Sequence, residues 1–318
     1  MDGNTSSTLL VNNRLRKKSI MRSLRFKKIN AFASEYSDGN PAAAIYLDSL
    51  EDLTDAEMHQ IAKELKGFVS EVGYVSPGVD TDYRLRYFSS EREVAFCGHA
   101  TIAIMNDIVA NNQELQNKVI LTIETKTDRL LVENRFKSEK SVYISAPPAR
   151  FSPKIVGITE INLALNCLVT EIDQSLPIEI VNGGLETLIV PIVTLDSILS
   201  LTPDIQTLDK FCKENGVDIV ILYSTETVSH ETKFRTRVFA PTFGYLEDPA
   251  TGSGNAALGY YLLKHAKWNG EMIKIEQNGF RDYPNYVQIF SKGTDIKNCQ
   301  VWFGGGAILK VDGEYILQ

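Results

Sequence analysis

The chain has 318 residues, of which 43% are hydrophobic and 23% are charged, a composition typical of a globular protein with one large or two medium domains. It contains no apolar run of roughly 18 residues, the length at which a membrane-spanning helix would be expected. The formal net charge is −7, and many basic residues are concentrated in positions 1–28, so the rest of the chain is strongly acidic. This charge balance argues against nucleic-acid binding as the main activity.

The basic N-terminal segment, residues 1–22, lacks the apolar stretch of a secretory signal. We expect it to be a flexible and dispensable extension. The four cysteines of the chain are widely scattered, and neither a C-x-x-C nor an H-E-x-x-H motif occurs. A zinc site or a disulfide framework is therefore not expected, and a reducing, cytoplasmic location fits this pattern.

The first elements along the chain are two strands and a helix. Residues 25–33 alternate as a strand does, and residues 37–47 predict a turn followed by a second strand. Residues 53–67 predict a helix, because Thr54 and Glu57 form a capping box ahead of an apolar stripe.

The next predicted strand, residues 68–77, contains a carboxylate among apolar residues. Both faces of this strand are mostly apolar, so Glu71 is expected to be buried, where an unpaired carboxylate is costly and has a raised pKa. One interpretation is a salt bridge to a nearby arginine such as Arg84 or Arg86. The other is a general acid/base whose pKa is tuned toward neutrality.

A strand over residues 83–89 leads to the stretch FCGHATIAI, which opens an apolar helix. A helix N-terminus presents unpaired N–H groups and the positive end of the dipole, which would lower the pKa of the Cys97 thiol. The stretch therefore has two interpretations. Either Cys97 is a reactive thiol, or Gly98 and His99 at the bare helix end are the functional part.

The pair Pro147-Pro148 marks a natural hinge between two halves. Further elements are predicted as strands over 118–136, 141–151, 163–172, 177–192 and 218–224. Within residues 197–216, a helix is predicted after Pro203, with Gly216 closing it. Cys212 falls inside that helix and is expected in the core. The triple glycine at 304–306 predicts a strand where another backbone comes close rather than a phosphate-binding loop.

The two halves share a short internal repeat. The motif R-x-R-x-F occurs at 84–88 and at 235–239, and each copy leads to a turn with Gly98 or Gly252 that opens a helix. This order indicates duplication and two similar lobes. Two helix starts that face each other across a cleft would bind substrate carboxylates or stabilise an enolate-like anion. The polar side chains at these starts are His99, Asp248, Thr251 and Ser253. The arginines of the repeat are expected in salt bridges on the strand faces.

Four motifs follow one another in the order seen in a known family. They are GNPAAA (39–44), SEVGYV (70–75), FCGHATIA (96–103) and EDPATGSGNAA (247–257). Together they resemble the PhzF-like isomerases of phenazine biosynthesis, which have the diaminopimelate-epimerase-like fold. The resemblance implies an α+β fold of two pseudo-repeated lobes, each an antiparallel sheet rolled around a central helix, with the active site in the cleft between them.

The resemblance also implies a cofactor-independent isomerase that moves a proton on a small carboxylate-bearing substrate. Carried over by motif, Glu71 is the proton-shuttling acid/base, and His99 and Asp248 are its polar partners. The residues that would hold the substrate are Asn40, Gly98, Gly252 and Ser253. From the residues alone, Asp248 has an alternative role as a capping or turn residue, and His99 as a helix cap.

The lobes are expected to span residues 23–146 and 147–308, and a C-terminal strand at about 309–318 is expected to complete the first lobe. The resemblance further implies a homodimer. No metal or other cofactor is expected, and neither a nucleic acid nor a membrane is expected as a partner.

Two other functions remain open from the sequence. A two-thiol racemase or epimerase of this fold needs a cysteine at each helix start, and Cys97 lies at the first, but the second start has none. A non-catalytic ligand-binding protein would keep the fold without needing a buried Glu71.

Overall fold

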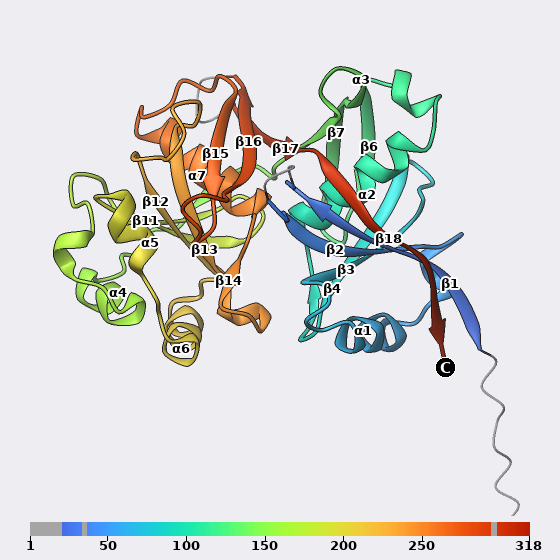
Figure 1. Cartoon of the computed structure of the whole chain (residues 1–318), viewed down its shortest axis with the longest axis horizontal. Coiled ribbons are helices and arrows are strands. Elements are labelled where there is room, and N and C mark those ends of the chain that lie inside the picture. Colours follow the sequence, from blue (N-terminus) through green and yellow to red (C-terminus); the bar gives the residue numbers. More distant parts are fainter. Residues whose placement is uncertain (1–20, 34–36, 294–297) are drawn as a thin grey trace, which may run out of the picture.

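The protein consists of two lobes that have the same internal arrangement (Figure 1). The computed structural model describes residues 21–33, 37–293 and 298–318. Most of the expected N-terminal extension, residues 1–20, lies outside the described residues, and the first strand begins at Arg22. Within the described part of the chain, no helix combines the length and the apolar character needed to cross a membrane.

In the first lobe a mixed sheet rolls around one helix, α2 (Gly98–Ala110). Its strands are β1 (Arg22–Ala31), β2 (Asn40–Tyr46), β3 (Glu71–Pro77), β4 (Tyr83–Ser89), β5 (Glu93–Val94), β6 (Ile120–Glu124), β7 (Arg129–Arg135), β8 (Ser141–Ser145) and β18 (Ala307–Leu317). They pair in the order β18-β1-β2-β3-β4-β6-β7-β8, antiparallel except for β2–β3 and β4–β6. Because strands surround α2, its sequence is apolar on nearly every face rather than amphipathic.

The second lobe repeats this plan around α7 (Gly252–Lys264). Its strands are β9 (Arg150–Phe151), β10 (Glu179–Asn182), β11 (Glu186–Pro191), β12 (Ile219–Ser224), β13 (Phe234–Phe239), β14 (Glu247–Asp248), β15 (Ile273–Gln277), β16 (Asn285–Lys292) and β17 (Gln300–Gly305). They pair in the order β9-β10-β11-β12-β13-β15-β16-β17, and β11–β12 and β13–β15 are the parallel pairs.

The internal repeat read from the sequence coincides with this duplication. Phe88 of β4 opposes Val72 of β3, and Phe239 of β13 opposes Val220 of β12 in the same register. β4 then pairs with the two-residue strand β5, and β13 pairs with the two-residue strand β14. Each of these short strands precedes the central helix of its lobe. The two helices therefore start from equivalent places.

The lobes are joined where β8 of the first pairs with β17 of the second. At this junction Phe303 opposes Ile144, and a Cβ atom added at Gly304 would lie 2.1 Å from the carbonyl oxygen of Val142. The interpretation of the triple glycine as a place of close backbone approach is therefore confirmed.

The remaining helices pack on the outside of the two sheets, except for the short α3 (Phe136–Glu139), which contacts the central helix of the first lobe. They are α1 (Asp55–Glu64), α3 (Phe136–Glu139), α4 (Ile158–Leu165), α5 (Leu195–Ser200) and α6 (Ile205–Asn215), with 3₁₀ turns at Leu50–Asp52, Leu115–Asn117, Val169–Glu171 and Pro241–Phe243. The predicted capping box of α1 is present, since Thr54 accepts from the N–H of Glu57 at 3.3 Å and the Glu57 carboxylate accepts from the N–H of Thr54 at 2.8 Å.

One of the predictions for the second half needs correction, and another is confirmed. The strand predicted over 163–172 is wrong: the segment holds the end of α4 and a 3₁₀ turn, because Ile161, Ala164 and Leu165 recur at helical spacing and are buried in the core. The helix predicted after Pro203 is confirmed as α6, which Asp204 caps and Gly216 closes, while the short α5 before it was not predicted. Cys212 is fully buried in the core, as predicted.

Candidate active site

The two central helices begin side by side at the junction of the lobes. The residues before them, Cys97 and Thr251, have nearly the same extended backbone, with φ, ψ of −131°, 105° and −122°, 104°, and neither side chain caps its helix. A Cβ atom added at Gly98 would lie only 3.2 Å from the backbone nitrogen of Ser253. The helix starts and their unpaired N–H groups therefore meet at one place, as the sequence predicted.

The glycines that open the two helices have a packing role. A Cβ atom would lie 2.9 Å from the ring of Phe303 if added at Gly98, and 2.2 Å from it if added at Gly252. Phe303 is fully buried, so the ring has no room to retreat. The expectation that the two glycines hold substrate stays a prediction, and Phe303 supplies an independent reason for them.

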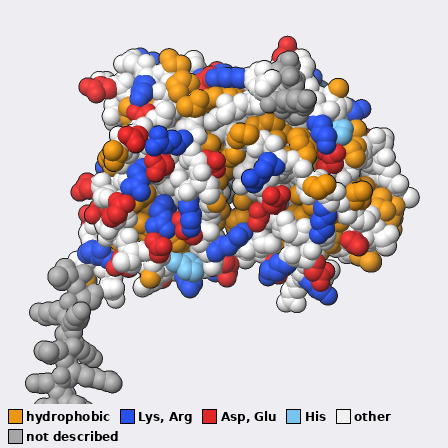
Figure 2. Space-filling model, turned by 180° about the vertical axis from the view of Figure 1, so that it is seen from behind, with side chains coloured by type: hydrophobic (Ala, Val, Ile, Leu, Met, Phe, Trp, Pro, Cys, Tyr) orange, Lys and Arg blue, Asp and Glu red, His pale blue; other side chains and the backbone are white. Residues whose placement is uncertain are grey.

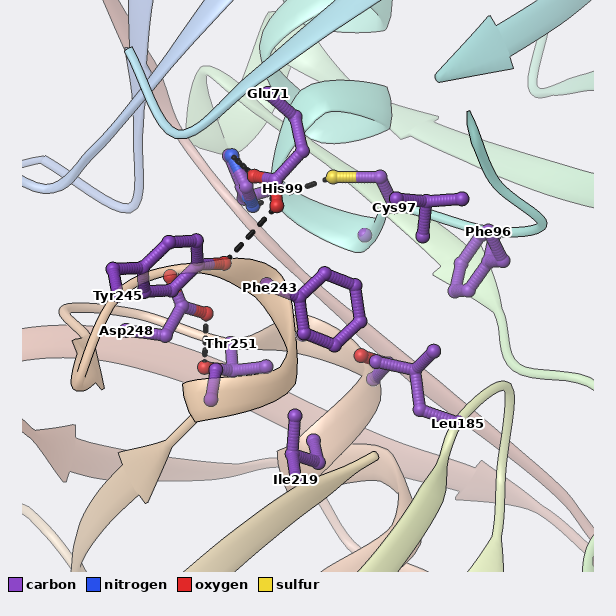
Figure 3. Close-up of a pocket in the computed structure, with 15 residues that line it drawn as sticks. Glu71, Phe96, Cys97, His99, Leu185, Ile219, Phe243, Tyr245, Asp248 and Thr251 are labelled. Carbon is purple, nitrogen blue, oxygen red and sulfur yellow. Dashed lines mark hydrogen bonds and ion pairs between the residues drawn. The ribbon is translucent and has the colours of Figure 1, made fainter. Parts of the chain in front are cut away.

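Glu71 is the first residue of β3, and its side chain reaches the helix starts (Figure 3). Its carboxyl Oε1 accepts a hydrogen bond from the Tyr245 hydroxyl at 3.0 Å, and Oε2 lies 3.2 Å from Nε2 of His99. The salt bridge to an arginine is not formed, because Arg84 pairs with Glu51 and Glu124, and Arg86 pairs with Asp55 and Glu93. The salt-bridge interpretation of Glu71 is therefore wrong, and its role as a general acid/base stays a prediction.

The surroundings of Glu71 raise the pKa of its carboxyl to about 8. Burial is the main cause, since the side chain is only 3% exposed, and the nearby Asp248 carboxylate adds to it. The hydrogen bond from Tyr245 acts in the opposite direction, because it stabilises the ionised form. A pKa in this range allows the carboxyl to gain and lose a proton near neutral pH.

His99 is the second residue of α2 and is 4% exposed. Its Nε2 faces Glu71, and its Nδ1 lies 3.5 Å from Sγ of Cys97. Burial lowers its pKa to about 3, so the ring is neutral at physiological pH. His99 makes its contacts to side chains of the cleft rather than serving as the residue that precedes the helix, a position that Cys97 holds.

Asp248 ends β14 on the opposite side and belongs to a dense hydrogen-bond network. Its Oδ1 accepts from Nδ2 of Asn40 at 2.6 Å, its Oδ2 accepts from the Thr251 hydroxyl, and its backbone oxygen accepts from Gln277 at 2.8 Å. Burial raises the pKa of Asp248 to about 7, although the bonds from Thr251 and Asn40 oppose the increase. The residue that precedes α7 is Thr251, so Asp248 is not its N-cap.

Asn40 ties the first lobe to this network. Besides its bond to Asp248, its amide donates to the backbone oxygen of Ala250 at 2.8 Å, and its own Oδ1 accepts from Ser70 at 3.3 Å. Asn40 is fully buried. The structure therefore brings it to the site, in contact with Asp248.

Cys97 departs from its expected electrostatics. The sequence predicted that the helix N-terminus lowers the pKa of this thiol, but its pKa is raised well above the ordinary value. Burial is the largest cause and the Glu71 carboxylate adds to it, so both outweigh the nearby backbone N–H groups of Ala100 and His99, which act in the opposite direction. Cys97 is therefore a protonated thiol at neutral pH.

Sequence reasoning missed two residues that complete the site. Tyr245 lies on the loop between β13 and β14, just before the motif EDPATGSGNAA, so its closeness to that motif was the only available signal. Gln277, on β15, accepts from the N–H of Thr251 at 2.9 Å and donates to the Thr251 hydroxyl at 2.9 Å. No local pattern connects Gln277 with the motif, because the sheet brings the two together.

A narrow cleft between the lobes is lined by Glu71, Cys97, His99, Tyr245, Asp248 and Thr251 (Figure 3). Asn40 and Gln277 do not line it but hydrogen-bond to Asp248 and Thr251 in its wall. Ser253, at the start of α7, also lines it and is 3% exposed. The apolar part of the wall consists of Val94, Phe96, Leu185, Ile219, Ala240 and Phe243. The cleft thus combines two carboxyls with raised pKa values, those of Glu71 and Asp248, with one neutral imidazole and two helix starts within apolar walls.

The sequence profile of the PhzC-PhzF family, described as phenazine biosynthesis-like protein, matches residues 29–312. The chain belongs to this family. Among its relatives, the uncharacterized isomerase YddE of Escherichia coli K12 is 28% identical over 91% of this chain and 97% of its own. Trans-2,3-dihydro-3-hydroxyanthranilate isomerase of Pseudomonas fluorescens is 27% identical over 88% of this chain and 98% of its own.

The PhzC-PhzF family also accounts for the fold. The crystal structure of a Bacillus anthracis phenazine biosynthesis protein of the PhzF family matches with a TM-score of 0.80, at 24% identity over 93% of this chain and 100% of that chain. The two-lobed α+β architecture and the family implied by the four motifs are therefore confirmed, and the protein is an isomerase.

Proposed function

We propose that this isomerase moves a proton on a small, carboxylate-bearing metabolite, with Glu71 as the general acid/base. One observation carries the proposal. Glu71 is a buried carboxyl that faces the adjacent starts of two helices, it has no cationic partner among Lys and Arg of the described residues, and its pKa is raised to about 8. A carboxyl kept in this state suits proton transfer to and from carbon near neutral pH.

The proposed reaction has two proton transfers. Ionised Glu71 takes a proton from a carbon beside a carbonyl or carboxylate, and the protonated carboxyl then returns it to another carbon on the same face. The oxygen that faces His99 is the better candidate for this step, because Oε2 has no aligned hydrogen bond whereas Oε1 is held by Tyr245. Negative charge that develops on the substrate is stabilised by the unpaired N–H groups of the two helix starts.

The lining of the cleft supports the proposed substrate class. Two bare helix starts favour a carboxylate group, and apolar side chains such as Phe96 and Phe243 suit a hydrocarbon body. The Pseudomonas relative is named for a carboxylate substrate, which supports the same class. In this proposal Asn40, His99 and Asp248 orient the substrate and the acid/base, and Ser253 contacts the substrate carboxylate.

The test is a screen of carboxylate metabolites in D₂O, in which deuterium incorporation at carbon is followed by NMR. The Glu71→Gln variant should lose about 10²–10⁴-fold of the exchange rate, the usual contribution of a general acid/base, while keeping the fold. Glu91→Gln is the matched control, because Glu91 is an exposed glutamate that pairs with Lys66 outside the cleft. Exchange near the wild-type rate in Glu71→Gln would refute the assignment.

The two-thiol mechanism is disfavoured by the second helix start, where Thr251 holds the position of Cys97. We therefore expect Cys97→Ser to keep most of the exchange rate. A loss as large as that of Glu71→Gln would favour thiol chemistry instead. The non-catalytic alternative predicts no exchange in either the wild type or the variants.

The expected homodimer and the cytoplasmic location stay predictions. On the face shown in Figure 2, acidic and basic side chains are interspersed rather than gathered into a basic patch. That surface gives no support for a nucleic-acid partner, in keeping with the acidic charge balance of the chain.

A further inference from the structure

Three potential metal donors of different chemistry converge beside the helix starts. Glu71, Cys97 and His99 each offer one atom, and these atoms all lie within 4.8 Å of one another. All three residues are buried. Among the residues that the structure describes, no other group of three or more His, Cys, Asp or Glu side chains has such spacing.

The spacing suits a small divalent cation. Zinc binds sulfur at about 2.3 Å and nitrogen or oxygen at about 2.0–2.2 Å, so tetrahedral neighbours on one ion lie roughly 3.3–3.7 Å apart. Oε2 of Glu71 lies 3.2 Å from Nε2 of His99, whereas Sγ of Cys97 lies 3.5 Å from the other ring nitrogen, Nδ1, so the two distances do not share one imidazole donor. With one donor atom taken from each residue, the three lie within 4.8 Å of one another, and side-chain rotations that shorten this spacing would bring them onto one ion.

A second observation points to a ligand at this place. Oε2 of Glu71 and Nε2 of His99 are both buried without a hydrogen bond, although they lie 3.2 Å apart. The pair is close but not aligned, so the lone pairs of both groups are available for another partner. Buried polar atoms in this state are uncommon, and an ion is one of the partners that explains them.

We propose that Glu71, Cys97 and His99 form a binding site for a thiophilic divalent cation such as Zn²⁺, and that the bound ion inhibits the isomerase reversibly. On binding, Glu71 and Cys97 each release one proton to solvent, and their two negative charges balance the ion. The neutral imidazole donates a lone pair. The donors come from β3 and from the start of α2, which explains why the sequence lacks a short zinc motif.

Inhibition follows from the chemistry of the same carboxylate. A Glu71 oxygen that coordinates the ion has no lone pair free to take a proton from substrate carbon. This part of the inference rests on the proposed function, whereas binding of the ion does not. The experiment below therefore reads binding by spectroscopy, independently of any substrate.

The experiment titrates the protein with Co²⁺, which replaces Zn²⁺ and absorbs strongly when bound to a thiolate. The wild type should show a thiolate-to-cobalt charge-transfer band that Zn²⁺ abolishes by competition and that EDTA removes. Cys97→Ser should lose the band, and Cys167→Ser, a half-buried cysteine in another part of the chain, should retain it. A cobalt ion held only by the surface pair His265 and Glu179 would show no such band, since that pair includes no thiol.

Glu71→Gln provides a second reading in case Cys97→Ser perturbs folding. It keeps the thiol but removes one ligand charge, so the apparent cobalt affinity should fall at least about tenfold, the loss usually caused even by removing a partner outside the ligand set. A band absent from the wild type, or one that survives Cys97→Ser, would overturn the site. If the band behaves as expected but Zn²⁺ leaves deuterium exchange unchanged, binding stands, and inhibition through Glu71 is refuted.

Discussion

The two lobes share a backbone plan but carry different side chains at equivalent places. Val72 and Val220 oppose the last residues of the two R-x-R-x-F motifs, so the residues before them, Glu71 and Ile219, correspond. Both line the cleft, one as a titratable carboxyl and the other as an apolar wall. Both lobes thus contribute to the shape of the site, whereas the proposed proton-transfer group comes from only one of them.

The other equivalent places divide in the same way. His99 and Ser253 are both the second residue of a central helix, while Val94 corresponds to Asp248 on the two-residue strands. The carboxylate of Asp248 is well satisfied by hydrogen bonds, whereas the carboxyl of Glu71 keeps one unaligned oxygen. We infer that the first lobe moves the proton and the second holds the groups that orient the reaction.

The largest expected difference between the lobes concerns an arginine–glutamate ion pair that occurs at equivalent positions in both. Arg235 and Glu276 are fully buried and 3.2 Å apart, whereas the equivalent Arg84 is 32% exposed and lies 3.6 Å from Glu124. Arg235→Met leaves a carboxylate buried without its cation and should lower the free energy of unfolding by about 3–5 kcal/mol. Arg84→Met should cost no more than about 1 kcal/mol. Urea unfolding of both variants measures the difference, and equal losses would contradict it.

The next effect concerns the pH dependence of stability. The pKa of Glu71 is about 8 in the folded protein and about 4.5 for an ordinary glutamate, so folding favours its protonated form. Its contribution to stability is full below about pH 4.5 and is lost as the pH rises through about 8. The side chain introduced by Glu71→Gln cannot ionise. Between about pH 5 and about pH 9, the free energy of unfolding of the wild type should therefore decrease by a few kcal/mol more than that of the variant.

Thermal or urea unfolding across this pH range checks the prediction, with Glu91→Gln as the control that keeps the wild-type slope. Asp248, whose pKa is about 7, contributes a slope of the same sign in both proteins. Parallel curves for the wild type and Glu71→Gln would mean that folding does not raise the pKa of Glu71. The equivalent residues Glu71 and Ile219 would then not give the two lobes different pH dependence.

A smaller effect distinguishes the two helix starts by packing. An alanine Cβ would lie 2.2 Å from the Phe303 ring at position 252 and 2.9 Å from it at position 98. Gly252→Ala should therefore destabilise by about 1–3 kcal/mol through overpacking. Gly98→Ala should cost less, because the clash is milder and alanine is the better helix former. The reverse order of stability would show that Phe303 does not lie closer to the second helix start.

The fold was largely predictable because its signals are local or repeated. The capping box of α1, the helix starts at Gly98 and Gly252 and the duplicated R-x-R-x-F motif each depend on residues that are close in sequence. The strand predicted over 163–172 failed because a short apolar run fits a buried strand and a buried helix equally well. Packing against the core of the second lobe decides whether this segment forms a helix or a strand.

The site was predictable only as far as its motifs extend. Glu71, His99 and Asp248 stand out because each is a polar group in an apolar or glycine-rich stretch, but their contacts depend on the sheet that brings the lobes together. The direction of the Cys97 pKa was predicted wrongly for the same reason. The helix N-terminus is visible in the sequence, whereas burial beside Glu71 is a property of the folded chain.

The finest test of the division between the lobes uses two substitutions with opposite effects on one pKa. Tyr245→Phe removes a hydrogen bond that lowers the pKa of Glu71, so that pKa should rise, while Asp248→Asn removes a carboxylate that raises it, so that pKa should fall. Because ionised Glu71 takes the proton, the rising limb of the pH profile of kcat/KM should move to higher pH in the first variant and to lower pH in the second. If the limb instead disappears in Asp248→Asn, the proton is moved by Asp248, and the acid/base belongs to the second lobe.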